Sequence, residues 1–136
     1  DVELSLPSLL EMPYMYNGTL DTLLLHCLDA QNIVIVWTML MAEQKVLLVS
    51  KEALVLTAVG EALRALLFPM HWQHVYIPVL PRSLLDILEA PVPFLVGVLA
   101  STFEHVELSD DVIKVDLDKN QITGGHPCEQ VFKLKL

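Results

Sequence analysis

Two histidines stand three residues apart in the segment His71-Trp72-Gln73-His74, a spacing that could place two imidazoles on one face of a helical turn. A zinc site needs three or four ligands with supporting hydrogen bonds, and no third ligand is evident beside this pair. Pro69 and the apolar segment after it also favour an extended chain over a helix. We therefore expect these histidines to be structural or to contact a partner, and we expect no bound metal.

The acidic segment near the end of the chain imitates a calcium-binding loop. Asp116, Asp118 and Asn120 have the spacing of the first three ligands of such a loop. However, the sixth position, which is glycine in these loops, is Gln121, and the twelfth, which is glutamate, is Pro127. The pattern instead predicts a turn at the end of a strand, in which the Asp and Asn side chains bond the local backbone.

Signs of covalent catalysis and of nucleotide binding are weak. Ser50 and Ser83 lack the flanking glycines of a nucleophile elbow, and no Ser-His-Asp order is evident. Cys27 directly follows His26, and adjacent side chains face away from each other. Gly124-Gly125 is too little glycine to cradle a phosphate, and no Gly-Lys-Ser/Thr follows it. We expect no cofactor and no enzyme active site, with an α/β hydrolase kept as a remote alternative.

The composition predicts one domain with a large apolar core. The chain has 136 residues, of which 54% are hydrophobic and only 18% charged. Parallel sheets covered by helices on both faces have such compositions, because their strands are apolar throughout. Surface covered by neighbouring domains would also raise the apolar fraction. The net charge of −9 disfavours binding to nucleic acid and to anionic lipid.

Two cysteines form no disulfide framework, so we expect free thiols in a reducing, cytoplasmic compartment. The chain opens Asp-Val-Glu-Leu-Ser-Leu, without an initiating methionine or a basic segment, so we expect no signal peptide in these residues and expect the chain to be a fragment of a longer protein. The charge-free run at residues 65–81 contains three prolines and two histidines, so we expect no membrane insertion.

Apolar segments separated by prolines and turn residues predict the order of elements. We treat residues 1–20 as an irregular lead-in, with 2–6 a short strand or an extended segment. Helices are expected at 30–42, capped by Asp29 and with Trp37 in the core, at 52–68, capped by Ser50, and at 81–89, with a helical turn at 101–105. The β-branched run in 33–36 favours a strand, but the length of 30–42 favours a helix. Strands are expected at 45–50, 75–78, 94–99, 112–117 and 131–136, with a loop at 123–129. This order predicts an α/β fold, a three-layer α/β/α domain with a mostly parallel central sheet of about five strands.

Residues 66–97 hold five of the eight prolines, namely Pro69, Pro78, Pro81, Pro91 and Pro93. Within them, FPMHWQHVYIPVLP is followed by LLDILEAPVPFLVGV, while MAEQKVLLVS lies upstream and VIKVDLDKNQI downstream. These four motifs, in this order over residues 42–122, resemble the central DENN domain. The resemblance covers most of the chain and implies that residues 1–136 are a single central DENN domain.

The resemblance also implies a set of residues with roles. The positions that it marks as determinants of the fold are Glu43, Ser50, Pro69, Trp72, Pro78, Pro81, Pro91, Pro93, Gly97 and Asp116, and Asp86 also aligns with an acidic family position. Candidates for contact with a partner are Trp72, His74 and Tyr76.

DENN modules are guanine-nucleotide exchange factors for Rab GTPases, in which the GTPase lies across two lobes. The resemblance therefore implies a non-covalent regulator in vesicle trafficking. Its partners would be a Rab-type GTPase and upstream and downstream DENN lobes, and other parts of the protein would attach it to vesicle or organelle membranes. The alternative is an architectural DENN-like domain that binds proteins without promoting exchange.

Overall fold

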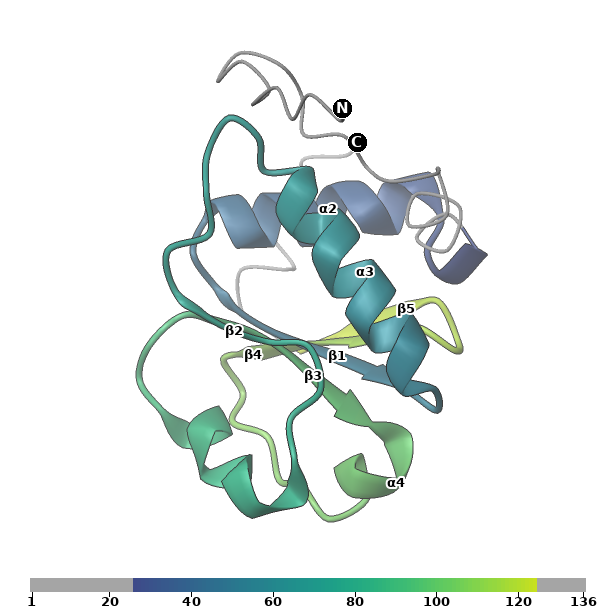
Figure 1. The fold of residues 1–136 in the computed structure, drawn as a ribbon, viewed down its shortest axis with the longest axis vertical. Helices are drawn as coiled ribbons and strands as arrows, with labels where there is room; N and C mark the ends of the chain where they lie inside the picture. The colour runs from purple at the N-terminus through teal and green to yellow at the C-terminus, as the bar shows by residue number, and fades with distance from the viewer. Residues whose placement is uncertain (1–25, 125–136) are drawn as a thin grey trace, which may run out of the picture.

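The computed structural model describes residues 26–124, which form a five-stranded sheet with helices on both faces (Figure 1). The strand order is β2-β3-β1-β4-β5. β1 is paired in parallel with β3 and β4, β2 in parallel with β3, and β5 is antiparallel to β4. The elements are α2 (Ala30–Met41), β1 (Lys45–Ser50), α3 (Ala53–Ala65), β2 (Val75–Ile77), the 3-10 helix η2 (Arg82–Glu89), β3 (Phe94–Leu99), α4 (Ala100–Phe103), β4 (Val112–Asp116) and β5 (Gln121–Thr123).

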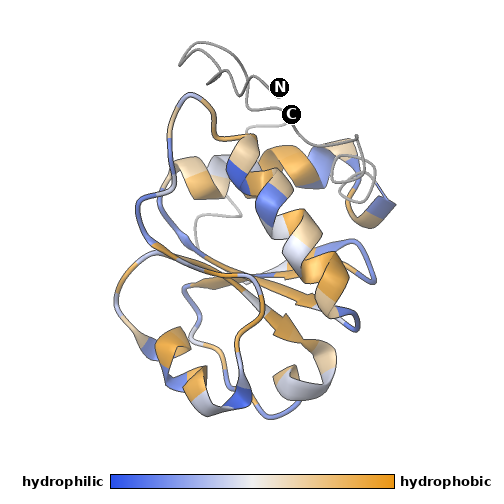
Figure 2. Ribbon diagram, in the orientation of Figure 1, coloured by the Kyte–Doolittle hydropathy of each residue, from blue (hydrophilic) through white to orange (hydrophobic). Residues whose placement is uncertain are grey.

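The predicted three-layer architecture is confirmed. α2 and α3 lie on one face of the sheet, and η2 and α4 lie on the other (Figure 1). The strands between them are predominantly hydrophobic (Figure 2). In β1, Val46 and Leu48 pack toward the helices α2 and α3, whereas Leu47 and Val49 pack toward η2 and α4. Both sets are buried, which explains why this strand is apolar at every position rather than at alternate ones.

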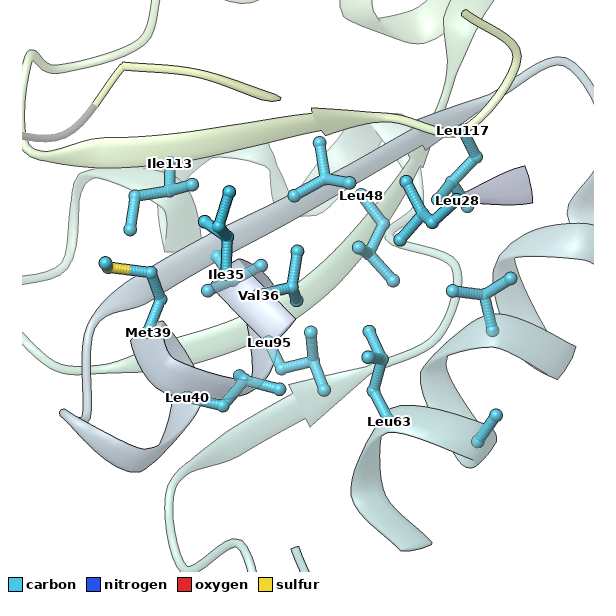
Figure 3. Packing of buried hydrophobic residues seen from close by; sticks show 14 of the residues in the cluster. Leu28, Ile35, Val36, Met39, Leu40, Leu48, Leu63, Leu95, Ile113 and Leu117 are labelled. Carbon is cyan, nitrogen blue, oxygen red and sulfur yellow. The ribbon is translucent and has the colours of Figure 1, made fainter. Parts of the chain in front are cut away.

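Two apolar clusters hold the layers together. In the cluster on the α2 and α3 face, side chains from both helices and from three strands point toward one another (Figure 3). The labelled members are Leu28, Ile35, Val36, Met39, Leu40, Leu48, Leu63, Leu95, Ile113 and Leu117. The cluster on the η2 and α4 face consists of Leu47, Val49, Leu80, Leu88, Phe94, Val96, Val98 and Val112. Each large side chain buried in this way stabilises the fold by about 1.5–3 kcal/mol.

α2 is a helix, as its length predicted, and the Asp29 carboxylate caps it by accepting the Asn32 N–H at 2.8 Å. The prediction that Trp37 lies in the core is wrong. Its side chain is 38% exposed, and its Nε1 donates to Leu66 O at 3.0 Å. The helix is apolar almost all round, so its spacing did not determine which stripe would be buried. The buried stripe consists of Ile35, Val36, Met39 and Leu40.

Several predicted boundaries move. Ser50 is the last residue of β1, and the N-cap position of α3 is Glu52, so the prediction of Ser50 as the cap is wrong. α3 ends at Ala65 rather than at residue 68, and β2 ends before Pro78. Pro81 occupies the N-cap position of η2, just outside the helix that was expected to include it.

The antiparallel edge strand β5 was not predicted, because residue 123 was assigned to a loop. The predictions for residues 1–20 and 131–136 lie outside the described residues.

Candidate partner-binding surface

The three predicted contact residues lie along one edge of the sheet. β2 is the last strand in the order on that side, and the chain enters it through Trp72 and His74. Tyr76 packs against the α2 and α3 cluster, while its strand neighbours Val75 and Ile77 pack against the opposite cluster. All three predicted residues are half-buried, and each is held by contacts within the domain.

Trp72 is fixed by a hydrogen bond to its own strand. Its Nε1 donates to Val75 O at 3.0 Å, and its ring packs on the α2 and α3 cluster. The Trp72 and His74 rings form a T-shaped pair, with the ring centroids 5.2 Å apart and the planes at 74°. An indole with a satisfied N–H and a fixed ring plane is a preorganised contact surface.

Glu43 lies beside His74 and has an unusual backbone conformation. Its φ is 56°, and it follows α2 where Glu43 N donates to Leu40 O and Gln44 N to Met39 O, both at 3.0 Å. This is the Schellman arrangement, whose left-handed position is usually glycine. Glu43 Oε1 lies 3.3 Å from His74 Nε2, which is shielded from solvent but makes no hydrogen bond among residues 26–124. The two side chains form an ion pair when His74 is protonated.

Tyr76 is held by three residues of α3. Its hydroxyl donates to Glu61 Oε1 at 2.9 Å, and the Arg64 guanidinium lies over its ring, 4.4 Å from the centroid. A β-carbon at position 60 would stand 2.8 Å from the hydroxyl oxygen, so Gly60 provides the space for the phenol. Burial, and then the hydrogen bond to Glu61, raise the pKa of Tyr76 well above its usual range.

No pattern in the sequence predicts that α3 and Tyr76 meet. Glu61 and Arg64 are charged positions of the predicted helix 52–68, and nothing in the sequence singles out Gly60. The spacing of Glu61 and Arg64, three residues apart on a helix, predicts that the two charges can pair, but not which strand they face. These three residues are the neighbours of Tyr76 that sequence reasoning missed.

A group of hydrogen-bonded polar side chains lies at the carboxyl ends of β1 and β4. Asp116 Oδ1 accepts the N–H groups of Asp118 and Lys119 at 3.0 and 3.1 Å, which confirms the predicted turn. Asp118 accepts the Ser50 hydroxyl at 3.1 Å and the Lys51 N–H at 2.9 Å. The buried Ser50 Oγ in turn accepts the Glu52 N–H at 3.3 Å.

Asn120 joins the same turn to the start of α2. Its φ is 53°, and its Oδ1 accepts the Asp29 N–H at 3.1 Å and the Asn32 amide at 2.9 Å. The side chains that imitated a calcium loop are therefore engaged with backbone N–H groups and with the side chains of Asp29, Asn32 and Ser50. Among residues 26–124, no group of three or more His, Cys, Asp or Glu side chains is placed to hold a metal ion.

Cys27, half-buried near this turn, does not have the environment of a nucleophile. Burial raises the pKa of its thiol, and the nearby Asp118 carboxylate raises it further. A nucleophilic cysteine needs the opposite, a positive environment that favours the thiolate.

Gly97 lies where β3 passes the end of β2. A β-carbon on it would overlap Pro78 O and stand 3.3 Å from Leu56 Cβ, and Leu80 N donates to Gly97 O at 2.7 Å. Pro91 and Pro93 lie in the connection between η2 and β3, and Pro69 lies in the turn after α3. The assignment of these positions as determinants of the fold stays a prediction.

A cleft of about 280 Å³ opens on the other face of the sheet, between η2 and the segment after α4. It is lined by Leu85, Asp86, Leu88, Glu89, His105, Val106 and Glu107. Its polar side chains are three carboxylates and one imidazole, and the lining contains no hydroxyl, thiol or amine side chain. In the part of the chain that the structure describes, no helix is long and apolar enough to cross a membrane.

Comparison with known proteins decides the family. The sequence profile of the DENN (AEX-3) domain matches residues 2–120. The chain belongs to the DENN domain family. It is 38% identical over 96 residues to DENN domain-containing protein 1B of Homo sapiens, which covers 69% of this chain and 12% of that protein.

Two further relatives come from a fungus and a plant. The chain is 41% identical over 100 residues to elicitor of plant defense protein 1 of Gibberella zeae, covering 73% of this chain and 9% of that protein. It is 35% identical over 108 residues to the DENN domain and WD repeat-containing protein SCD1 of Arabidopsis thaliana, covering 79% of this chain and 9% of that protein. The chain thus spans about a tenth of the length of these relatives.

In this DENN domain, the predicted residues divide between the two ends of the parallel strands. Trp72 and His74 precede β2, and Glu43 precedes β1, so these three gather at the amino end of the sheet. Ser50 and Asp116 end their strands and lie at the carboxyl end. The buried Gly60 packs against Tyr76 from inside the domain. The predicted contact residues Trp72, His74 and Tyr76 therefore form one surface together with Glu43 and with Glu61 and Arg64 of α3. We call it the β2-edge surface.

Proposed function

We propose that this DENN domain is the central scaffold, and part of the GTPase-binding face, of a guanine-nucleotide exchange factor for Rab-type GTPases. The observation that carries the proposal is the DENN profile match over residues 2–120. The β2-edge surface supports it, because Trp, Tyr and Arg are the residue types that dominate binding energy at protein interfaces, and this surface has a half-buried Trp and Tyr beside an exposed Arg.

The proposed mechanism requires no bond-making by this chain. An exchange factor binds the nucleotide-free GTPase more tightly than the nucleotide-bound form, and by linkage it weakens nucleotide binding to the same extent. A thousandfold weakening corresponds to about 4 kcal/mol of differential binding. Such a difference needs a surface that does not rearrange on contact. The hydrogen bonds that fix Trp72 and Tyr76 provide that rigidity.

In this proposal the domain acts together with other parts of its protein. Upstream and downstream DENN lobes complete the GTPase-binding site, and further segments place the cytoplasmic protein on a vesicle or organelle membrane. The domain itself contacts neither nucleic acid nor the membrane interior. Because one lobe alone offers only part of the site, we expect the isolated domain to have weak exchange activity or none.

Nucleotide release tests the proposal directly. The full-length protein is mixed with each member of a Rab panel loaded with a fluorescent GDP analogue, and release is followed after addition of excess unlabelled nucleotide. We expect faster release from at least one Rab. If no member of the panel releases nucleotide faster than it does alone, the exchange assignment is wrong.

The second candidate is an architectural DENN domain that assembles a complex without promoting exchange. The hydrogen bonds that hold Trp72 and Tyr76 also favour this architectural role, since a rigid surface suits any protein partner. Binding separates the two functions, because an exchange factor prefers the empty GTPase whereas an architectural domain has no reason to discriminate. Equal affinity for empty and GDP-loaded Rab would favour the architectural role.

A further inference from the structure

Arg64 is the one cation of the β2-edge surface, and it is held in place from two sides. Its guanidinium stacks over the Tyr76 ring at 4.4 Å, and the side chain remains 41% exposed. A stacked, planar guanidinium has already lost much of the rotamer freedom that a free arginine side chain gives up on binding. The position therefore combines rigidity with access from outside.

The carboxylate contacts of Arg64 involve only one of its nitrogens. Within residues 26–124, Nη1 lies 3.4 Å from each oxygen of Glu61, and the guanidinium also hydrogen-bonds the Tyr76 hydroxyl oxygen. Glu61 Oε1 makes its shorter bond, 2.9 Å, to the Tyr76 hydroxyl. Neither Nε nor Nη2 of Arg64 bonds a carboxylate among the described residues. Their N–H groups are parallel and form the fork that takes a carboxylate with two hydrogen bonds.

We propose that Arg64 is a contact residue that binds an aspartate or glutamate side chain of the partner GTPase through its Nε and Nη2 edge. The inference deepens the proposed function and rests on it. The chemistry of the guanidinium decides the occupant, because the exposed group of Arg64 is a cation with hydrogen-bond donors and no acceptor, which an acidic side chain complements. Tyr76 and Glu61 act as positioning residues that orient the guanidinium.

The test uses the full-length protein and the GTPase that responds in the release assay. Dissociation constants for the nucleotide-free GTPase are measured for the wild type and for Arg64→Gln, Arg64→Lys and Arg82→Gln. Arg82 is exposed at the start of η2 on the opposite face, so Arg82→Gln makes the same change in charge away from the surface. Circular dichroism and urea unfolding establish that each variant is folded.

We expect Arg64→Gln to weaken binding at least tenfold, and Arg82→Gln to leave it within about twofold. Arg64→Lys should recover only part of the loss, because an ammonium supplies charge without the planar fork. Substituting alanine for each acidic residue on the GTPase surface should identify one position that matters in the wild type but no longer matters beside Arg64→Gln.

Two outcomes overturn the inference while leaving the proposed function in place. One is unchanged binding by Arg64→Gln, and the other is an equal loss in Arg64→Gln and Arg82→Gln, which would indicate only a general effect of charge. If the wild type binds no nucleotide-free GTPase, the proposed function fails and the inference fails with it. A full recovery by Arg64→Lys would contradict the two-bond geometry.

Discussion

Replacing Gly97 by alanine should destabilise the domain more than other single-methyl additions to it. The new β-carbon would overlap Pro78 O and stand 3.3 Å from Leu56 Cβ. Pro78 O belongs to the backbone, and β3 cannot withdraw because it is paired with β1 on one side and with β2 on the other. To relieve the overlap, β2 must therefore move away from β3, or the 2.7 Å hydrogen bond from Leu80 N to Gly97 O must break.

The size of the effect follows from this rigidity. Adding a methyl group to a packed core usually costs 1–3 kcal/mol, and strain against backbone belongs at the upper end, about 3 kcal/mol. A small domain has a urea slope of about 2 kcal/mol per molar, so the unfolding midpoint should fall by roughly 1.5 M. The measurement is urea unfolding of the 136-residue chain, followed by circular dichroism at 222 nm.

Gly60→Ala is the matched control, since it adds the same methyl group to a buried glycine. Its closest neighbour is the Tyr76 hydroxyl at 2.8 Å, the end of a side chain, which can shift slightly by weakening its hydrogen bond to Glu61 whereas the backbone atom Pro78 O cannot. Alanine also stabilises a helix interior by about 1 kcal/mol relative to glycine. Gly60→Ala should therefore change the free energy of unfolding by less than about 1 kcal/mol. In a Tyr76→Phe background, where the hydroxyl is absent, the same substitution should raise the free energy of unfolding relative to Tyr76→Phe alone. If Gly97→Ala unfolds within 0.3 M of the wild type, roughly 0.6 kcal/mol at that slope, the packing argument is refuted.

Two further predictions concern the polar ties. The absorbance at 295 nm of the wild type minus that of Tyr76→Phe should show Tyr76 ionising at higher pH than a free tyrosine, whose pKa is about 10, and Glu61→Gln should bring the ionisation back toward that value. Since the folded state keeps the Tyr76 proton to higher pH than the unfolded state, the contribution of this group to stability is complete below about pH 10 and falls as pH rises above it. A difference spectrum that shows Tyr76 ionising at the usual pH would contradict this prediction. Asp118→Ala removes the acceptor of the buried Ser50 hydroxyl and of Lys51 N–H and should cost about 1–3 kcal/mol in urea unfolding. The double variant Ser50→Ala with Asp118→Ala should cost less than the sum of the single changes, and additive losses would mean that the two side chains are not coupled.

The layers of this fold could be predicted because its central strands are buried on both faces. β1 and β3 are apolar at successive positions, which a sheet covered on one face does not require. Prolines at 69, 78, 81, 91 and 93 all fall in the connections between elements. Asp29 predicted the start of α2 because its carboxylate satisfies an N–H group of the first turn that has no partner within the helix.

The failures have a common physical origin in contacts between distant residues. Helical spacing puts Trp37 among the apolar positions of α2, but only the docked helix defines which of those positions are buried. Ser50 was assigned to a local cap, whereas its hydroxyl donates to Asp118, 68 residues away. β5 has three residues and a single partner strand, so its sequence resembles the loop around it.

The candidate surface was half predictable. Trp72, His74 and Tyr76 came from the motif, and they do lie together. α3 completes the surface with Glu61 and Arg64, and its Gly60 leaves room for Tyr76. Only the crossing of that helix over the edge strand brings these three residues to Tyr76. Helical spacing fixes which residues share a face, not which strand that face meets.

The affinity of the full-length protein for one Rab in two states tests the central claim most directly. Isothermal titration calorimetry would compare the nucleotide-free GTPase with the same GTPase saturated with GDP. The account predicts binding to the empty form that is tighter by about a thousandfold, equivalent to about 4 kcal/mol. Equal affinities, for a Rab that the protein demonstrably binds, would contradict it.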